Sequence, residues 1–204
     1  MIPIMKKLIL SLALGLLCVA GSCSRTENPY YFDGSVSQAV LERYLARAVT
    51  MSEFLTVDPY CNDGTYPDKA ADVAFIRNTG AKFIGRAIYR WGDEKVLTEP
   101  GFWAGAEALV GEVHAFDPDV IFQAAAFEAV YRDVNEVPVP AWAFEALGLP
   151  VEERNFDYSQ MLSPDGKYVD LWGPGGSVPD ITRVETQLWL MYLIGSYVDL
   201  SLIH

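Results

Sequence analysis

The sequence predicts an α/β fold built from a parallel β/α repeat. Three observations lead to this prediction. Short, nearly continuous apolar segments alternate with longer segments of helical periodicity, and this alternation requires parallel strands joined by crossover helices. Clusters of Gly, Pro, Asn and Asp separate the segments. Hydrophobic residues make up 51% of the 204 residues, which is enough for a sizeable buried core.

The expected elements follow the changes of hydrophobic period along the chain. Gly80 stands at the left-handed position after one helical segment, Asp117-Pro118 closes another, and Asp180 can cap the last. In chain order we expect a helix at 35–48, a strand at 49–57, a helix at 68–78, a strand at 81–89, a helix at 102–116, a strand at 120–127, a short helix at 141–147, a helix at 181–195 and a strand at 197–204.

One connection is much longer than the others. It runs from residue 128 to 179 and contains two turn signals, Ser-Pro-Asp-Gly at 163–166 and Gly-Pro-Gly-Gly at 173–176. Because scaffolding does not need a loop of this length, such a segment often builds a binding site. We therefore expect residues 35–204 to form one β/α domain with a functional loop region.

Two architectures fit this order of elements. One is the N-terminal half of a TIM (β/α)8 barrel, truncated after its fourth strand, since a full barrel takes about 250 residues. The other is a small open, doubly wound sheet. The segment after the first strand, DPYCNDG, lacks the glycine-rich phosphate turn of dinucleotide-binding sheets. Polar residues follow the strand ends, as the active face of a barrel requires, so the half barrel is the preferred prediction.

The N-terminal segment has the features of a targeting signal. Lys6 and Lys7 form a basic region, and the apolar run at 8–20 is too short to span a bilayer. Small residues then precede Cys23, an arrangement that resembles a bacterial lipoprotein signal with Cys23 as the lipidated residue. We expect a signal peptide at 1–22 and attachment to a membrane through the lipid alone, with secretion as the alternative.

We interpret residues 23–34 as a tether. Both lipid attachment and secretion would place the domain outside the cytoplasm. A formal net charge of −12 argues against a nucleic-acid partner. Apart from Cys18 and Cys23, only Cys61 remains, so no internal disulfide is expected. Neither zinc-ligand spacing nor the pattern of a calcium-binding loop occurs, and we expect no metal and no cofactor.

Charged residues stand at or near the ends of the expected strands. Glu128 follows the third strand, where a carboxylate would face the mouth of a barrel and act as an acid or base. Arg86 and Arg90 surround the end of the second strand and can orient a carboxylate. Glu53 lies inside the first strand and Asp58 directly after it, so both are candidates for substrate binding. The alternatives are structural ion pairs among these residues, or a pair between Glu128 and the arginine at position 132.

Aromatic residues fall in or beside the same loops. Trp91 follows the second strand, Tyr131 the third, and Trp172 lies in the long connection. Their flat faces can stack on sugar rings, although each could instead serve core or loop packing. As a group they favour a carbohydrate ligand.

The strand ends FIGRAIYRW (83–91) and FQAAAFEAVY (122–131) resemble the first half of TIM-barrel glycoside-hydrolase-like domains of bacterial lipoproteins. The resemblance implies a protein that acts on poly- or oligosaccharide outside the cytoplasm. In the related clan of retaining glycosidases the two catalytic carboxylates follow strands four and seven, so no residue here matches either. A non-catalytic carbohydrate-binding or scaffold lipoprotein, or a small α/β domain with an unrelated ligand, therefore remains as an alternative.

Overall fold

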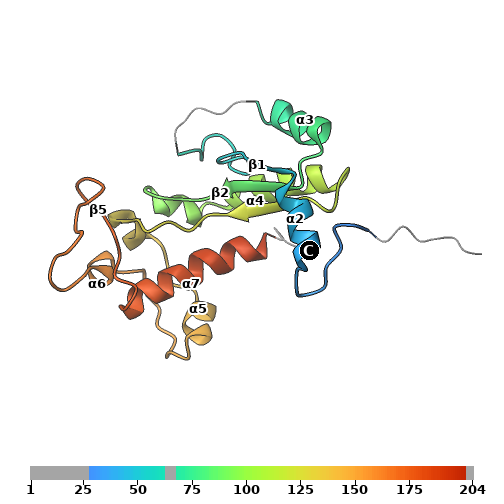
Figure 1. Ribbon diagram of the computed structural model, residues 1–204. Coiled ribbons are helices and arrows are strands. Elements are labelled where there is room, and N and C mark those ends of the chain that lie inside the picture. Colours follow the sequence, from blue (N-terminus) through green and yellow to red (C-terminus); the bar gives the residue numbers. More distant parts are fainter. Residues whose placement is uncertain (1–27, 63–67, 201–204) are drawn as a thin grey trace, which may run out of the picture.

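A parallel sheet of three short strands lies in the upper half of the molecule in Figure 1, a computed structural model that describes residues 28–62 and 68–200. The strands are β1 (Ala48–Thr50), β2 (Phe83–Ile88) and β3 (Ile121–Ala124), and their order in the sheet is β1-β2-β3. Both strand pairs are parallel, with Val49 beside Ile84 and Ile84 beside Phe122. The predicted parallel β/α repeat is thus confirmed for these three strands.

Helices α3 (Lys69–Thr79) and α4 (Pro100–His114) connect the strands. Asp68 caps α3 by accepting a hydrogen bond from Ala71 N at 2.9 Å, and Gly80 ends it with φ 64°. The two helices contact each other, so both lie on the same face of the sheet. This is the expected result of two successive right-handed crossovers between neighbouring strands.

The remaining elements precede the sheet or belong to the second half of the chain. They are α2 (Gln38–Leu45), η1 (Glu94–Thr98), β4 (Val130–Tyr131), η2 (Arg132–Glu136), α5 (Ala141–Ala146), α6 (Tyr158–Met161), β5 (Gly176–Ser177) and α7 (Val184–Asp199). Strands β4 and β5 pair antiparallel. Helix α7 contacts both α5 and α6, and Figure 1 shows all three below the sheet.

One hydrophobic core runs through both halves of the molecule. On the sheet side, the rings of Phe54 and Phe122 stack with centroids 5.8 Å apart. On the other side, Phe156 packs edge-on against Trp189 of α7 at 5.2 Å. The core therefore fixes the long connection, which carries α5 and α6, against the sheet.

The predicted fourth strand at 197–204 is wrong for its first residues, because Tyr197 to Asp199 form the last turn of α7. Trp189, Leu193 and Tyr197 are all buried and follow one another at four-residue spacing, which is the period of a helix. The apolar residues at this end of the chain therefore continue the inward stripe of α7. Residues 201–204 lie outside the described part of the chain.

Other boundaries also differ from the prediction. Strand β1 ends at Thr50, because residues 51–60 fold into successive turns such as Phe54 N to Met51 O, at 3.1 Å. Helix α7 begins at Val184, since the Asp180 side chain accepts hydrogen bonds from Thr182 and does not cap the helix. Helix α2 begins at Gln38 and not at residue 35, because Ser37 caps it: Ser37 Oγ accepts from Val40 N at 3.3 Å.

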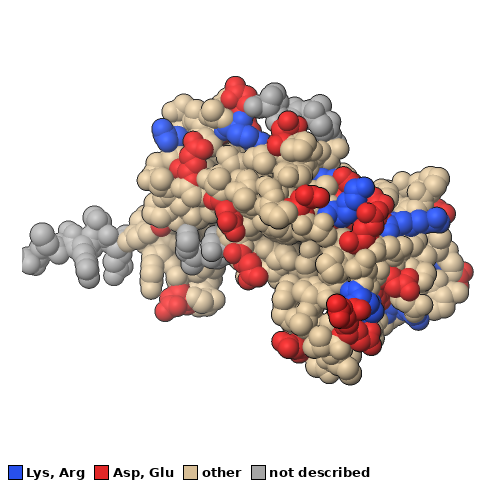
Figure 2. All heavy atoms as spheres, turned by 180° about the vertical axis from the view of Figure 1, so that it is seen from behind, with Lys and Arg blue, Asp and Glu red and all other residues tan. Residues whose placement is uncertain are grey.

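The surface carries charges of both signs without a large basic area on the face shown in Figure 2. Acidic and basic side chains are scattered there around a broad uncharged area. Of the helices in residues 28–62 and 68–200, none has the length and apolarity needed to cross a bilayer. The predicted signal peptide at 1–22 and Cys23 lie outside the described residues.

Part of the expected tether is described, and it packs on the domain. The Tyr30 ring lies edge-on to the Tyr44 ring at 5.1 Å, and the Lys82 ammonium lies 4.5 Å above the same Tyr30 ring. Asn28 Nδ2 donates to Asp119 Oδ1 at 2.6 Å. Residues 28–34 therefore follow the surface near α2 and the start of β3.

Candidate functional site

A hollow of about 300 Å³ lies beside the carboxyl ends of β2 and β3. The loop after β2 contributes Trp91, and the segment after β3 contributes Phe127, Glu128, Ala129 and Tyr131. Trp172 completes the lining from the long connection before β5. Four residues predicted from sequence as site candidates, Trp91, Glu128, Tyr131 and Trp172, are thus brought together in one place.

Aromatic rings form one wall of this hollow. Trp91 and Phe127 have ring centroids 4.7 Å apart, and Tyr89 packs behind them at 5.3 Å from Trp91 and 5.2 Å from Phe127. Trp91 is 37% exposed and Trp172 is 49% exposed, whereas Tyr89 is buried. Burial of tryptophan is normally favourable, so two exposed indole rings around one hollow are unusual. Exposed apolar surface that is grouped in this way is typical of a binding site.

Tyr131 is held in place by two contacts from different elements. Its backbone N–H donates to Glu94 Oε1 at 3.1 Å. Its ring covers Gly176 of β5 so closely that a Cβ atom at Gly176 would overlap it. The β4–β5 pair therefore sets the position of the Tyr131 ring at the hollow.

Glu94 is a buried acid that the sequence analysis missed. Its Oε1 accepts hydrogen bonds from Gly92 N at 3.0 Å and from Tyr131 N at 3.1 Å, so it joins the loop after β2 to the segment after β3. Its Oε2 is buried and has no hydrogen-bond partner among the described residues. Burial raises the pKa of the Glu94 carboxyl, although the two backbone donors oppose the shift. Nothing in the sequence distinguishes Glu94 from its exposed neighbours Asp93 and Lys95.

Arg86 contacts the aromatic wall beside the hollow. Its guanidinium is 5.3 Å from the centroid of the Tyr89 ring and 5.1 Å from that of Phe127. Its backbone adopts φ 56°, a left-handed conformation that is uncommon outside glycine. The pairing of β2 with β3 is irregular between Ile84 and Ile88, which is where Arg86 lies. A strained backbone thus presents a cation beside the hollow.

Arg90 has structural contacts and does not line the hollow. It is 6% exposed, and it donates to Gly92 O at 2.9 Å, to Tyr60 O at 2.7 Å and to Asp93 Oδ2 at 3.2 Å. These bonds fasten the loop after β1 to the loop after β2. Of the ion pairs considered from sequence, none forms at Arg90; its acidic partner is Asp93.

Glu53 and Asp58 also lie outside the lining of the hollow. Glu53 is in a turn after β1 and not inside a strand, with φ 58° and 2% exposure. Its Oε1 accepts from Asn62 N at 2.8 Å, so the carboxylate holds the loop together. Asp58 is exposed in the same loop.

Glu128 is an exposed residue at the edge of the hollow. The alternative pair with Arg132 does not occur: the Arg132 guanidinium lies 5.9 Å from the Tyr158 ring, and no ion pair between the two residues is present. Among the described residues that line this hollow, Glu128 is also the one carboxylate.

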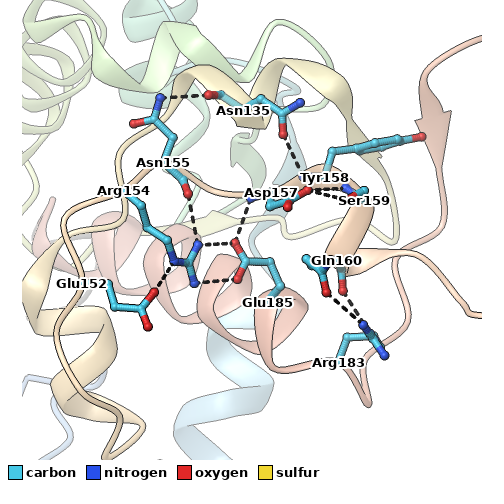
Figure 3. A network of polar contacts seen from close by, with 10 residues as sticks. All are labelled: Asn135, Glu152, Arg154, Asn155, Asp157, Tyr158, Ser159, Gln160, Arg183 and Glu185. Atoms are coloured by element: carbon cyan, nitrogen blue, oxygen red, sulfur yellow. Dashed lines mark hydrogen bonds and ion pairs between the residues drawn. The ribbon is translucent and has the colours of Figure 1, made fainter.

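A second hollow, of about 730 Å³, is lined by polar residues of the long connection and the start of α7. Figure 3 shows the network beside it. Arg154 Nη1 and Nη2 donate to Glu185 Oε1 and Oε2 at 2.7 and 2.8 Å, and Arg154 Nε donates to Glu152 at 2.7 Å. Arg183 donates to Gln160. Because these groups satisfy one another, we assign this hollow a structural role.

Within the described ranges, no group of three or more His, Cys, Asp and Glu side chains is placed to hold a metal ion. The lone Cys61 is buried, and burial raises the pKa of its thiol. Comparison of the chain with protein-family models, with curated proteins and with solved structures finds no match.

Proposed function

We propose that the hollow beside the carboxyl ends of β2 and β3 binds carbohydrate. The observation that carries this proposal is its lining: two exposed tryptophan rings, Phe127 and Tyr131 surround a space that also contains one carboxylate. A sugar ring combines apolar C–H faces with hydroxyl groups, so it matches a site of flat aromatic surfaces with a few polar atoms. The volume of about 300 Å³ is at the low end for ligand sites and suits one or two sugar rings.

The arrangement of the sheet supports a barrel-like interpretation of the fold. In a TIM barrel, successive strands are neighbours and all crossover helices lie on the outer face. The order β1-β2-β3 and the contact between α3 and α4 have this character, and the hollow lies where barrels place their sites. A doubly wound sheet instead places its crossover helices on both faces. Here α7, which faces Phe83 and Ile121 from the other side of the sheet, does not connect any two of the three parallel strands. We therefore propose that β1, β2 and β3 with their crossover helices form part of a barrel-like β/α domain, attached outside the cytoplasm through Cys23.

We extend this proposal to glycoside hydrolysis by a protein that contains this site. Hydrolysis requires two carboxylates, about 5–5.5 Å apart for retention or roughly 6.5–9.5 Å apart for inversion. Glu128 is the candidate proton donor, and the lining of the hollow provides no second acid. Carbohydrate binding therefore follows from the hollow itself, whereas catalysis depends on a carboxylate from elsewhere. The Glu128→Gln variant separates the two, because it would abolish sugar release by a hydrolase and leave stacking on the tryptophans intact.

The test is a titration of the full chain with neutral oligosaccharides derived from cellulose, xylan, mannan and galactan, followed by tryptophan fluorescence and calorimetry. We expect at least one of them to bind, and Trp91→Ala and Trp172→Ala to weaken its affinity by about tenfold each. Trp142→Ala is the matched control, because Trp142 is 38% exposed but lies on α5, away from the hollow. Absence of binding, or equal losses in all three variants, would refute the proposal.

A further inference from the structure

Arg86 is a cation without an acidic partner in the part of the chain that is described. It takes part in none of the ion pairs found there, and its guanidinium nitrogens make no hydrogen bond to a described residue. Its Nε is buried. A buried donor without an acceptor costs free energy, so its retention calls for an explanation.

The composition of the chain makes this lack of a partner more informative. Acidic residues outnumber Lys and Arg by 27 to 15, so carboxylates are abundant. Glu53 follows β1 close to Arg86, since its N–H donates to the Arg86 carbonyl at 3.1 Å, yet its carboxylate bonds to Asn62 N. Glu128 makes no ion pair with Arg86 either. Neither of these two acids therefore forms an ion pair with the Arg86 guanidinium.

A second donor lies next to Arg86. Gln123 of β3 accepts from the Arg86 backbone N–H through its Oε1 at 3.3 Å. This bond fixes the amide group, whose Nε2 has no acceptor among the described residues. The guanidinium and the amide together provide N–H donors on neighbouring strands. This is the donor pattern that recognises a carboxylate.

We infer that Arg86, assisted by Gln123, binds the carboxylate of an acidic sugar, so that the preferred ligands are oligosaccharides containing uronic acid. This inference rests on the proposed carbohydrate site, to which it adds the substrate class. Phe127 connects the two parts, because one of its faces contacts Arg86 and its ring also lines the hollow beside Trp91. A sugar stacked in the hollow therefore has a neighbouring subsite for charge. The aromatic contacts of Arg86 hold the planar guanidinium in a fixed orientation, which lowers the entropy lost on binding.

The experiment compares trimers of galacturonate, mannuronate and guluronate with their methyl esters, which keep the sugar backbone and remove the charge. Affinities are measured by calorimetry at low salt on the full chain and on Arg86→Gln, Arg86→Lys and Arg77→Gln. The last variant is the matched control, since the Arg77 guanidinium also lies over an aromatic ring, that of Phe116 at 4.4 Å, but on α3. Thermal unfolding of each variant checks that it is folded.

We expect at least one uronate trimer to bind about tenfold more tightly than its methyl ester. Arg86→Gln should abolish this difference, Arg86→Lys should keep part of it because Lys retains charge without the planar fork, and Arg77→Gln should leave it unchanged. The inference is overturned if no uronate is preferred over its ester, or if the preference survives Arg86→Gln. Binding of neutral oligosaccharides in that case would show that the carbohydrate site stands and the acidic specificity does not. Absence of binding by every oligosaccharide would overturn both.

Discussion

Two polar regions of this molecule differ in how completely their charged groups are satisfied. In the network of Figure 3, Arg154 is bonded through all three guanidinium nitrogens to Glu152 and Glu185, and Glu185 also accepts from Asp157 N at 2.8 Å. These contacts raise the pKa of Arg154, mainly through its hydrogen bonds to Glu185. At the carboxyl edge of the sheet, Arg86 and Glu94 each retain a buried atom without a hydrogen-bond partner among the described residues. The first region holds the fold together, and the second is the region that we propose binds a ligand.

The unsatisfied groups are concentrated near the sheet. The buried side-chain atoms without a hydrogen-bond partner in the described residues belong to Thr56, Asn62, Arg86, Glu94 and Tyr197. Four of these residues lie in β2 or in the segments that follow β1 and β2, and none belongs to the Arg154 network. Unsatisfied buried atoms reduce stability, so their grouping marks a place that was not optimised for stability alone.

Backbone strain follows the same distribution. Among the described residues, the non-glycine positions with positive φ are Glu53, Arg86, Asp93, Tyr168 and Asp170. The first three lie in or after β1 and β2, and the last two lie in the loop that carries Trp172. Such conformations cost about 1–3 kcal/mol each and are typical of functional sites. Unsatisfied buried polar atoms and strained backbone conformations are therefore two separate features that distinguish the carboxyl edge of the sheet from the Arg154 network.

The largest loss of stability should follow from a substitution in the Arg154 network. Glu185→Gln removes one of the two charged acceptors of Arg154 at a position that is 7% exposed, and we expect a loss of about 2–3 kcal/mol in the free energy of unfolding. Glu152→Gln removes the other acceptor of the same arginine, but the Glu152 side chain is 59% exposed, so the loss should stay below about 0.5 kcal/mol. Urea unfolding measures both, and equal losses would contradict a structural role centred on Glu185.

A smaller effect should follow from displacing one wall of the hollow. In Gly176→Ala, the new methyl group overlaps the Tyr131 ring, so the ring must shift; we expect a loss of about 1–2 kcal/mol and weaker carbohydrate binding. Gly111→Ala is the control, because no atom lies within 4 Å of its added Cβ and the position is inside α4. It should stabilise the chain by up to about 1 kcal/mol. Unchanged affinity in Gly176→Ala would show that Tyr131 does not shape the site.

The smallest effect concerns the pH dependence due to Glu94. Because burial raises its pKa in the folded state, folding favours the protonated form, and this contribution is fully present below the unfolded pKa of about 4.3. It is lost as the pH rises through the folded pKa. Gln at this position keeps one acceptor for Gly92 and Tyr131 and cannot ionise. The stability of Glu94→Gln relative to the natural chain should therefore increase from pH 4 to pH 7 in urea unfolding, and a constant or decreasing difference would contradict the raised pKa.

The sequence was a good guide where local patterns decide the structure. The three parallel strands, the limits of α3 at Asp68 and Gly80, and the short helix α5 follow from hydrophobic period and capping chemistry. The rule that ligands meet the carboxyl ends of parallel strands predicts that Trp91, Glu128 and Tyr131 lie near one another, and all three line the hollow. Trp172 joined them because it lies in the long connection.

The sequence was a poor guide where tertiary contacts decide. An apolar helix end and a buried strand have similar compositions, so the sequence predicts a strand where the last turn of α7 lies. Glu94 lies between charged neighbours, and only the approach of the segment after β3 makes it a buried acceptor. Arg90 fastens two loops because the fold brings two backbone carbonyls within reach of its guanidinium. The Arg86 guanidinium has no such acceptor among the described residues.

Amide hydrogen exchange, read by mass spectrometry with and without the tightest-binding oligosaccharide from these titrations, tests the central claim most directly. It reports on both regions of the same molecule at once. We predict slower exchange in the bound state for segments 86–94 and 125–131, and no change for segments 152–160 and 183–187. Protection confined to the Arg154 network, or no protection at the carboxyl edge of the sheet, would contradict the assignment of the binding site.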